Sequence, residues 1–351
     1  MDIESRIGLI RSEPLEEVIT EADLRAILES NDHPKHYIGL EISGMMHLGS
    51  LILNGKKIND FGKAGLRTNV LLADWHTMAN NKFGGDWERI IKASKLYRKA
   101  FNIFCPNTNV LLGSELYEKE GEDYWKNVMQ FARRTTMARA TRTLIIQGRS
   151  QKDTLHVSQY IYPMMQTADI LALDVDVPHA GMDQRKIHVL AKELFNDMKL
   201  KRIAPVHHHL LSSLAAPPKL GPNATKEDEV LATKMSKSKP GSAILITATD
   251  EEVRKTIRGA WCPEKTIEGN PVLELCRYLI MPLNGLIKIE RKKEHGGDVE
   301  YKSYAKLEGD FRSGALHPVD LKNAVAGAII SIISPVREKL LEDTELMEAF
   351  K

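Results

Sequence analysis

The stretch that decides the fold runs from His36 to Ser50 and has the sequence HYIGLEISGMMHLGS. Its first half, HYIGLEI, is a run of mostly apolar residues typical of a buried strand. Its second half opens residues 47–63, whose apolar residues have helical spacing. A turn between a strand and a helix presents backbone N–H groups and the positive end of the helix dipole to an anion. The stretch therefore predicts a strand, an anion-binding turn and a helix.

The same alternation of strand and helix continues along the chain. Buried strands are predicted at TNVLLAD (68–74), NVLLGS (109–114), DVDVPH (174–179) and APVHHHLL (204–211), and helices from about Asp86 and over 182–198. Strands that alternate with helices indicate parallel βαβ units. Ligands bind at the carboxyl ends of the strands in such a sheet. The fold class predicted is α/β, with a Rossmann-like parallel-sheet nucleotide-binding domain.

The two ends of the chain have a different pattern. The first 30 or so residues are predicted to be helical, with Thr20 and Asp23 resembling a capping box before a helix. After about Asp250 the strand signals fade, and residues 249–261, 271–280 and 320–333 are predicted as helices. We predict two domains, residues 1–248 and residues 249–351, and expect the second domain to be all-helical.

Composition excludes several classes of protein. Of 351 residues, 42% are hydrophobic and 27% are charged, so the chain is neither disordered nor fibrous. The net charge of +2 excludes a histone-like polycation but permits a nucleic-acid partner, because a patch can hide inside a neutral total. Residues 124–152 hold seven cations and no acids: Lys126, Arg133, Arg134, Arg139, Arg142, Arg149 and Lys152. This basic stretch is either a solvated helix face or a surface for RNA phosphates.

Membrane and secretory signals are not evident. The longest apolar candidates, such as 327–333, are far shorter than the ~18 residues that cross a bilayer. The charged amino terminus has no secretory h-region. Cys105, Cys262 and Cys276 are odd in number and far apart, which argues against a disulfide framework and fits a reducing cytosol. We expect a cytoplasmic protein without a membrane partner.

Two short motifs are suited to phosphate. In the turn of the opening stretch, Gly49 allows close approach of a nucleotide, and His47 and Ser50 can donate to phosphate oxygens; the alternative is a turn with an incidental histidine. The second motif is KMSKS at 234–238, followed by Lys239, a cationic loop suited to polyphosphate or else a solvated linker. The pair is far more specific than either motif alone.

A third pattern indicates a ligand-binding site. Tyr162, Gln166 and Asp169 are spaced i, i+4 and i+7, so they share one face of a helix. This polar stripe presents a phenol, an amide and a carboxylate in a row. A purely structural stripe is more often apolar, so the ligand-binding interpretation is favoured over the structural one.

Together these motifs resemble a known family. HLGS is similar to the HIGH signature, and KMSKS matches the second signature, of class I aminoacyl-tRNA synthetases. The wider strings YIGLEISGMMHLGS, LLADWH, YPMMQTADI, GMDQRKIH, KMSKSKP and LHPVDLKNAV resemble tyrosyl-tRNA synthetases of the archaeal and eukaryotic type, over about residues 19–339. The resemblance implies a homodimeric tyrosine–tRNA ligase that forms tyrosyl-adenylate from L-tyrosine and ATP and then charges the 3′ end of tRNA(Tyr).

The resemblance also implies roles for individual residues. Tyr37 and Asp169 would bind the tyrosine hydroxyl, Tyr162, Gln166 and Gln184 its ammonium group, and Glu41, Leu71, Ala73 and His76 would line the pocket. The ATP site would comprise Gly44, His47, Gly49, Ser50, Lys234, Met235, Ser236, Lys237 and Ser238, with His47, Ser50, Lys234 and Lys237 catalytic. Mg²⁺ would be held by ATP oxygens and water, so no metal site of the protein's own is expected. Ser50 departs from the usual His or Asn at that position.

Features that face tRNA follow from the same resemblance. Arg142, Arg185 and Lys186 would touch the first acceptor base pair; His317 and Asp320 would read the anticodon, with His295 stacking on its first base. Residues of about 115–150 would form an insertion for acceptor binding and dimerisation, and 233–241 the KMSKS loop. From the residues alone, Asp320 is better interpreted as the N-cap of a helix.

Some alternatives stay open at this point. The tryptophanyl enzyme is the nearest neighbour in fold, although Asp169 with Tyr37 argues against it. A small-molecule nucleotidyltransferase shares the H-x-G-x site, and a non-catalytic RNA-binding relative is the third possibility. The triplet 207–209, all histidine, does not indicate a metal site, because successive side chains of a strand point to opposite faces.

Overall fold

The computed structural model describes residues 1–148, 154–218, 232–235 and 241–351. By internal contacts the chain forms two compact units. Unit 1 comprises residues 1–44, 57–209 and 344–351, and unit 2 comprises residues 45–56 and 210–343. These units are not the predicted domains 1–248 and 249–351, because the opening turn and the residues after 209 pack in unit 2. The functional division at 248 stays a prediction.

Unit 1 is built on a six-stranded sheet of order β1-β6-β5-β2-β3-β4. Its strands are β1 (Leu15–Val18), β2 (Lys35–Leu40), β3 (Arg67–Leu72), β4 (Asn109–Leu112), β5 (Val177–Gly181) and β6 (Val206–His208). All neighbouring pairs are parallel except β1 with β6, which is antiparallel. The predicted parallel sheet is confirmed, and β1 is an addition that the sequence analysis missed.

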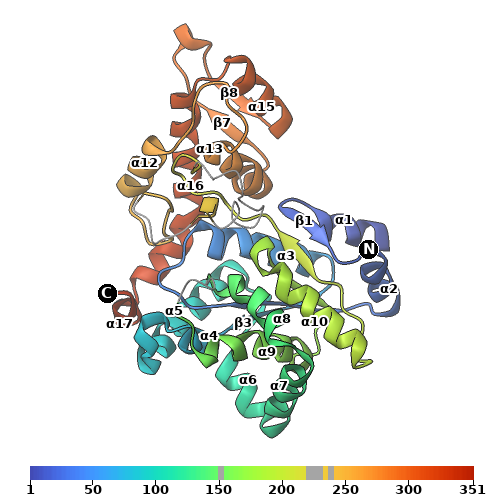
Figure 1. Cartoon of the computed structure of the whole chain (residues 1–351). Coiled ribbons are helices and arrows are strands. Elements are labelled where there is room, and N and C mark those ends of the chain that lie inside the picture. Colours follow the sequence, from blue (N-terminus) through green and yellow to red (C-terminus); the bar gives the residue numbers. More distant parts are fainter. Residues whose placement is uncertain (149–153, 219–231, 236–240) are drawn as a thin grey trace. The chain divides into compact units, whose positions relative to one another are not determined.

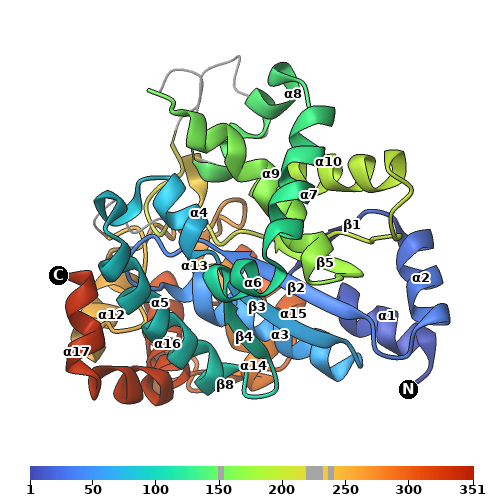
Figure 2. The same cartoon turned by 90° about the horizontal axis from the view of Figure 1, so that it is seen from below.

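Helices cover both faces of this sheet (Figures 1 and 2). On one face, α9 (Val157–Ala172) and α10 (Arg185–Asp197) pack with α6 (Gly113–Glu120) and α7 (Glu122–Arg134) around a core that includes Tyr37 and Leu71. On the other, α1 (Ile3–Arg11), α2 (Glu21–Ser30) and α3 (Asn54–Lys63) pack against Val177 and Val206. In α10, Ile187, Leu190, Ala191 and Leu194 lie on one face of the helix and are buried.

Local sequence explains where these helices begin. Thr20 caps α2 by accepting from the Asp23 backbone N–H at 3.2 Å, as predicted. Asp86 caps α5 (Trp87–Phe104) in the same way, accepting from the Arg89 N–H at 3.1 Å. The remaining elements of unit 1 are α4 (Asp74–Ala79), η2 (Lys82–Gly85), α8 (Met137–Arg142), η3 (Leu144–Gln147), η4 (Met182–Gln184), α17 (Thr344–Met347) and η7 (Glu348–Phe350).

Unit 2 is mostly helical. Its elements are η1 (Gly49–Leu53), α12 (Asp250–Gly259), α13 (Pro271–Leu275), η5 (Cys276–Ile280), α14 (Met281–Asn284), η6 (Lys293–His295), α15 (Tyr304–Ser313) and α16 (Pro318–Leu341). The prediction of an all-helical carboxyl-terminal domain is corrected by one antiparallel pair, β7 (Ile287–Ile289) with β8 (Val299–Tyr301). These three-residue strands are too short and too charged to show a periodic signal.

Helix α16 is long and apolar enough, by length and composition alone, to cross a membrane, and it is the one such helix among the described residues. Core helices of soluble proteins pass the same test. One stripe of α16, with Leu321, Val325, Ile329 and Ile333, is fully buried within the unit.

A row of histidines crosses the sheet of unit 1. His36 on β2 contacts His179 on β5 at 3.1 Å between ring nitrogens, and His179 contacts His208 on β6 at 2.8 Å. The neighbouring His207 points to the other face, where it contacts His188 at 3.0 Å and Glu17 at 3.0 Å. The predicted alternation within the histidine triplet is thus confirmed. Burial lowers the pKa of His36, His207 and His208 to about 3, and lowers the pKa of His179 and His188 well below the usual value.

These five histidines predict an acid-sensitive fold. They stay neutral in the folded chain but take up protons below a pKa of about 6.5 in the unfolded chain. Their stability contribution is therefore fully present above about pH 6.5 and is lost as the pH falls toward 3, by about 1.4 kcal/mol per pH unit for each histidine. At pH 5.5, one unit below that pKa, the five losses add to roughly 7 kcal/mol, which is comparable with a typical total stability of about 5–15 kcal/mol. Urea unfolding followed by circular dichroism at pH 7.5 and 5.5 should show a large fall in midpoint; equal midpoints would contradict this account.

Candidate active site

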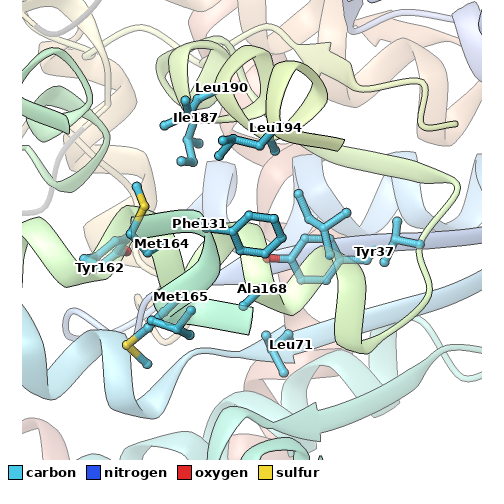
Figure 3. Packing of buried hydrophobic residues seen from close by; sticks show 14 of the residues in the cluster. Tyr37, Leu71, Phe131, Tyr162, Met164, Met165, Ala168, Ile187, Leu190 and Leu194 are labelled. Atoms are coloured by element: carbon cyan, nitrogen blue, oxygen red, sulfur yellow. The ribbon is translucent and has the colours of Figure 1, made fainter. Parts of the chain in front are cut away.

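The predicted polar stripe lies on one helix of unit 1. Tyr162, Gln166 and Asp169 all belong to α9, and their side chains are buried. Figure 3 shows Tyr162 of this helix in the same buried group as Tyr37, Leu71 and Ala168. The structure therefore brings the stripe together with the strand residues that the resemblance assigned to the same pocket.

Tyr37 projects from β2 into this group and is only 1% exposed. The Tyr37 hydroxyl lies so close to the backbone of Gly39 that a Cβ added to this glycine would stand 2.5 Å from the phenolic oxygen. Glycine at position 39 is thus required by the close approach of this phenol. Leu71, near the end of β3, belongs to the same core cluster, and Ala73, which precedes α4, is buried.

Asp169 is the buried acid of the group. Its Oδ1 accepts a hydrogen bond from the Tyr124 hydroxyl at 2.8 Å, and its Oδ2 lies 3.7 Å from Nε2 of His76. Burial raises the pKa of Asp169 to about 7, against the opposing effect of the hydrogen bonds from Tyr124 and Tyr117. A carboxyl so placed is a strong acceptor for a buried hydroxyl.

Tyr117 and Tyr124 were missed by the sequence analysis. They come from α6 and α7, and their rings stack with centroids 4.1 Å apart. The available signal was the spacing of Tyr124, Val128 and Phe131, which form the buried face of α7. That spacing shows a buried face but not which partner it meets.

His76 on α4 is neutral in this environment. Burial lowers its pKa to about 3, and its ring packs edge-on against Tyr162 with centroids 4.5 Å apart. Its Nδ1 lies 3.4 Å from the Tyr117 hydroxyl. Its buried Nε2 has no hydrogen-bond partner among the described residues. The imidazole is thus available to a polar group that enters beside Asp169.

The other predicted pocket residues include two amides and a carboxylate, whose oxygens can accept hydrogen bonds. Gln166 donates weakly to Gln184 at 3.4 Å, and Gln184 donates to the Ile146 carbonyl at 2.9 Å. The buried Oε1 of Gln166 has no partner in the described part of the chain. Glu41, at the end of β2, accepts from Asn80 at 2.6 Å and lies 3.6 Å from the Lys82 ammonium. These acceptors suit a ligand ammonium.

The candidate phosphate turn belongs to unit 2. The Ser50 hydroxyl accepts from the His47 N–H at 2.8 Å and donates to the His47 carbonyl at 3.0 Å. Nδ1 of His47 accepts from the Gly49 N–H at 3.1 Å, and a Cβ at position 49 would stand 3.0 Å from the ring. His47, Gly49 and Ser50 therefore form one tight turn that opens the π-helix η1, a rare element frequent at functional sites. Gly44, just before the turn, has a φ of +118° and belongs to unit 1.

The ends of the KMSKS loop are anchored within unit 2. Lys234 pairs with Ser212 in an isolated bridge, and the buried Met235 donates its N–H to the Leu211 carbonyl at 2.6 Å. After the loop, Leu245 pairs with His47 itself. The chain that follows the loop is thus hydrogen-bonded to the phosphate turn. Ser236, Lys237 and Ser238 lie outside the described residues.

The predicted tRNA-facing residues lie on several elements. Arg142 is exposed at the end of α8, and Arg185 and Lys186 begin α10, where Arg185 pairs with Glu17 at 2.9 Å. In unit 2, His317 caps α16 by accepting from the Val319 N–H at 3.2 Å. The interpretation of Asp320 as the N-cap is therefore wrong: Pro318 starts the helix, and Asp320 lies in its first turn. The His295 side chain lies outside the described part of the chain.

The basic stretch is partly neutralised. Arg139 pairs with Glu193, Arg134 lies 3.8 Å from Asp197, and Lys126 lies 3.4 Å from Glu122. Arg149 and Lys152 lie outside the described residues. The stretch therefore combines paired cations with the exposed Arg142.

Known proteins share this sequence and fold along the whole chain. The model of the tRNA synthetases class I (W and Y) family matches residues 29–334. The tyrosine–tRNA ligase of Pyrococcus furiosus is 42% identical over an alignment of 372 positions, which covers 100% of this chain and 98% of that protein. The tyrosyl-tRNA synthetase of Pyrococcus horikoshii, solved in complex with L-tyrosine, superposes with a TM-score of 0.91 at 40% identity and covers 100% of this chain and 99% of that one. The tryptophanyl-tRNA synthetase of Aeropyrum pernix shares the fold, at 18% identity and a TM-score of 0.70 over 99% of this chain and 92% of that one.

The chain therefore belongs to the class I tRNA synthetases, in the family that serves tryptophan and tyrosine. Enzymes of this class use ATP as a substrate. Within the family, its full-length relatives are tyrosine–tRNA ligases, and the comparisons favour tyrosine over the tryptophan alternative. They also leave the small-molecule nucleotidyltransferase without support.

Proposed function

We propose that this chain is a tyrosine–tRNA ligase in which the residues of the polar stripe select tyrosine. The observation that carries the proposal is the buried Asp169 carboxyl, which lies near the buried His76 and Tyr37. In this proposal, Asp169 and Tyr37 bind the substrate hydroxyl. Tyr162, Gln166 and Gln184 hold the ammonium group, and Glu41, Leu71, Ala73 and His76 complete the walls. A ligand without the hydroxyl leaves these buried polar groups unpaired, and tyrosyl enzymes are the standard example of such discrimination.

The first chemical step needs positioning more than proton transfer. The tyrosine carboxylate is already a nucleophile at neutral pH; it attacks the α-phosphate of ATP, forms tyrosyl-adenylate and expels pyrophosphate. Catalysis therefore consists of alignment and of stabilising the negative charge that builds up on the phosphates. We assign the phosphate contacts to Gly44, the turn 47–50 and the lysines of residues 234–238. The internal hydrogen bonds of Ser50 support a role in shaping that turn.

Magnesium enters as part of the ATP substrate. Mg²⁺ is commonly held by phosphate oxygens and water with few protein ligands. Among the described residues, no group of three His, Cys, Asp or Glu could hold a metal ion.

In the second step the tyrosyl group passes to the 3′ end of tRNA(Tyr). We assign the first acceptor base pair to Arg142, Arg185 and Lys186. His317 and Asp320, at the start of α16, and His295, at the end of η6, are assigned to the anticodon. The exposed position of Arg142 supports the first assignment. Residues 1–248 would then carry the chemistry, and 249–351 the anticodon contacts.

The proposal is tested by ATP–pyrophosphate exchange and by charging of tRNA(Tyr). Exchange should require tyrosine, and charged tRNA should accumulate only when tyrosine and ATP are both present. Exchange driven by tryptophan and not by tyrosine would overturn the assigned substrate. A chain that binds tRNA(Tyr) without exchange would instead be a non-catalytic relative.

We also propose that the chain is a homodimer. Large apolar side chains are exposed on three helices that follow one another: Trp125, Met129, Met137, Val157 and Ile161. Such a set of exposed apolar side chains is typical of an interface with another protein. Met129 is 68% exposed and Val157 75% exposed, which makes them the most open of the set.

The double variant Met129→Glu/Val157→Glu is expected to be a monomer at micromolar concentration, because each glutamate would be desolvated at the interface. Analytical ultracentrifugation measures the mass. Leu341→Glu, on a residue of α16 that is 45% exposed, is the control and should stay dimeric. A wild-type monomer at the same concentration would contradict the proposal.

A cytoplasmic location is proposed on the state of the cysteines. Cys105, Cys262 and Cys276 form no disulfide, and all three are buried. Burial raises the pKa of each thiol, so none is set up as a reactive thiolate. This cysteine chemistry fits a reducing compartment.

A further inference from the structure

The two oxygens of Asp169 have different surroundings. Oδ1 accepts the Tyr124 hydroxyl at 2.8 Å, a short and favourable distance. Oδ2 lies 3.7 Å from Nε2 of His76, which is beyond hydrogen-bond distance. Oδ1 is therefore held by Tyr124 and Oδ2 lies toward His76, while Tyr117 is the second phenol that hydrogen-bonds this carboxyl.

Tyr124 is held firmly where it makes this bond. Its side chain is 1% exposed, and its ring stacks on Tyr117 at 4.1 Å and meets Trp125 edge-on at 5.3 Å. Its hydroxyl also lies 3.3 Å from the Met165 carbonyl, one turn before Asp169 on α9. Packing on both sides of the ring leaves the phenol no room to swing away from the carboxyl.

We propose that Tyr124 is a positioning residue for tyrosine selection, whose hydroxyl fixes Oδ1 of Asp169 so that Oδ2 is presented to the para-hydroxyl of the substrate. The inference rests on the proposed function, because it refines how the same site recognises tyrosine. It assigns to α7, a helix without a predicted pocket residue, a part in amino-acid specificity.

The bond from Tyr124 also helps to keep Asp169 ionised. Groups that face this carboxyl come from every element around it: Tyr117 on α6, Tyr124 on α7, Asp74 and His76 on α4, and Tyr37 on β2. Burial and the charge of Asp74 raise the pKa of Asp169, and the two phenols lower it. Loss of the Tyr124 hydroxyl therefore raises this pKa further, and a larger share of Asp169 is protonated at neutral pH.

The test compares the wild type with Tyr124→Phe, which removes one oxygen and keeps the ring. In ATP–pyrophosphate exchange the KM for tyrosine should rise about 10-fold, the effect of one hydrogen bond to a charged group, while kcat changes by less than about threefold. The kcat/KM for phenylalanine should not change, because that substrate has no hydroxyl for Asp169. Discrimination between the two amino acids should therefore fall about 10-fold.

The pH profile provides the second measurement. In the wild type, kcat/KM for tyrosine should fall as the pH drops through the pKa of Asp169, and this acid limb should move to higher pH in Tyr124→Phe. The control is Tyr301→Phe, which removes an equivalent phenol–carboxylate bond, that to Asp310 at 2.9 Å in unit 2. It should leave the discrimination and the acid limb unchanged.

An equal loss of activity toward tyrosine and phenylalanine in Tyr124→Phe would overturn the proposal, because a structural defect acts on both substrates alike. An unchanged tyrosine KM would overturn it as well. The ratio of the two substrates does not depend on the fraction of enzyme that is folded, so partial misfolding does not blur the result. Failure of the proposed function is distinct, since the wild type itself would then not activate tyrosine.

Discussion

Replacing Asp169 by alanine should lower kcat/KM for tyrosine in ATP–pyrophosphate exchange by about 100-fold to 1,000-fold. The reason is twofold. The substrate hydroxyl loses its carboxylate acceptor, and the Tyr37 hydroxyl and the His76 imidazole, which are buried beside it, lose the carboxyl that they face. Activity toward phenylalanine should stay the same or rise, because the alanine removes a polar group that this substrate cannot satisfy.

Two further variants separate recognition from folding. Asp169→Asn keeps the shape and one acceptor oxygen, so its loss should be smaller than that of Asp169→Ala. Asp174→Asn, at a residue only five positions further along whose carboxylate pairs with Lys35 at 3.0 Å and is 62% exposed, should leave the tyrosine kinetics unchanged. Retention of tyrosine selectivity in Asp169→Ala would contradict the assigned pocket.

The second large effect is expected at His47. His47→Ala should lower kcat for exchange by about 100-fold to 1,000-fold, the usual loss for one preorganised donor to developing charge. The KM for tyrosine should stay within about threefold, because the tyrosine-binding residues are separate from those of the phosphate turn. A kcat effect without a KM effect is what transition-state stabilisation predicts.

His47 also has a structural part that must be separated from the chemical one. Its Nδ1 accepts from the Gly49 N–H at 3.1 Å, so alanine loses this contact as well. His47→Asn offers an oxygen acceptor to the same N–H but has no imidazole for phosphate. Restoration of kcat by asparagine would assign His47 to the shape of the turn and contradict its catalytic role. His33→Ala, at an exposed histidine, is the control and should change neither constant.

The central strands could be predicted from sequence because they are buried on both faces. β2 contains the apolar run 37–40 and β3 ends in the apolar run 70–72, and such short apolar runs are typical of buried parallel strands. β1 could not be predicted, since Leu-Glu-Glu-Val is a four-residue edge strand that becomes a strand only by pairing with β6. Short charged strands of this kind have no signal apart from their tertiary partner.

The candidate site, like the fold, could be predicted from the sequence only in part. The α9 stripe was visible because its members lie on one helix with fixed spacing. The contribution of α7 was not, because contact between Tyr124 and Asp169 joins residues 45 positions apart. Asp320 was misassigned from local propensity, since His317 and Pro318 together start α16 before Asp320 is reached. Long-range contacts and competing caps are decided by the fold.

The most direct test of the central claim is exchange by the wild-type chain with tyrosine, phenylalanine and tryptophan measured side by side. The account predicts exchange with tyrosine and a kcat/KM for phenylalanine lower by at least about 1,000-fold, because Asp169 is buried to pair with a substrate hydroxyl. Tryptophan should give no exchange above background. Comparable exchange with phenylalanine, or exchange with tryptophan alone, would contradict it.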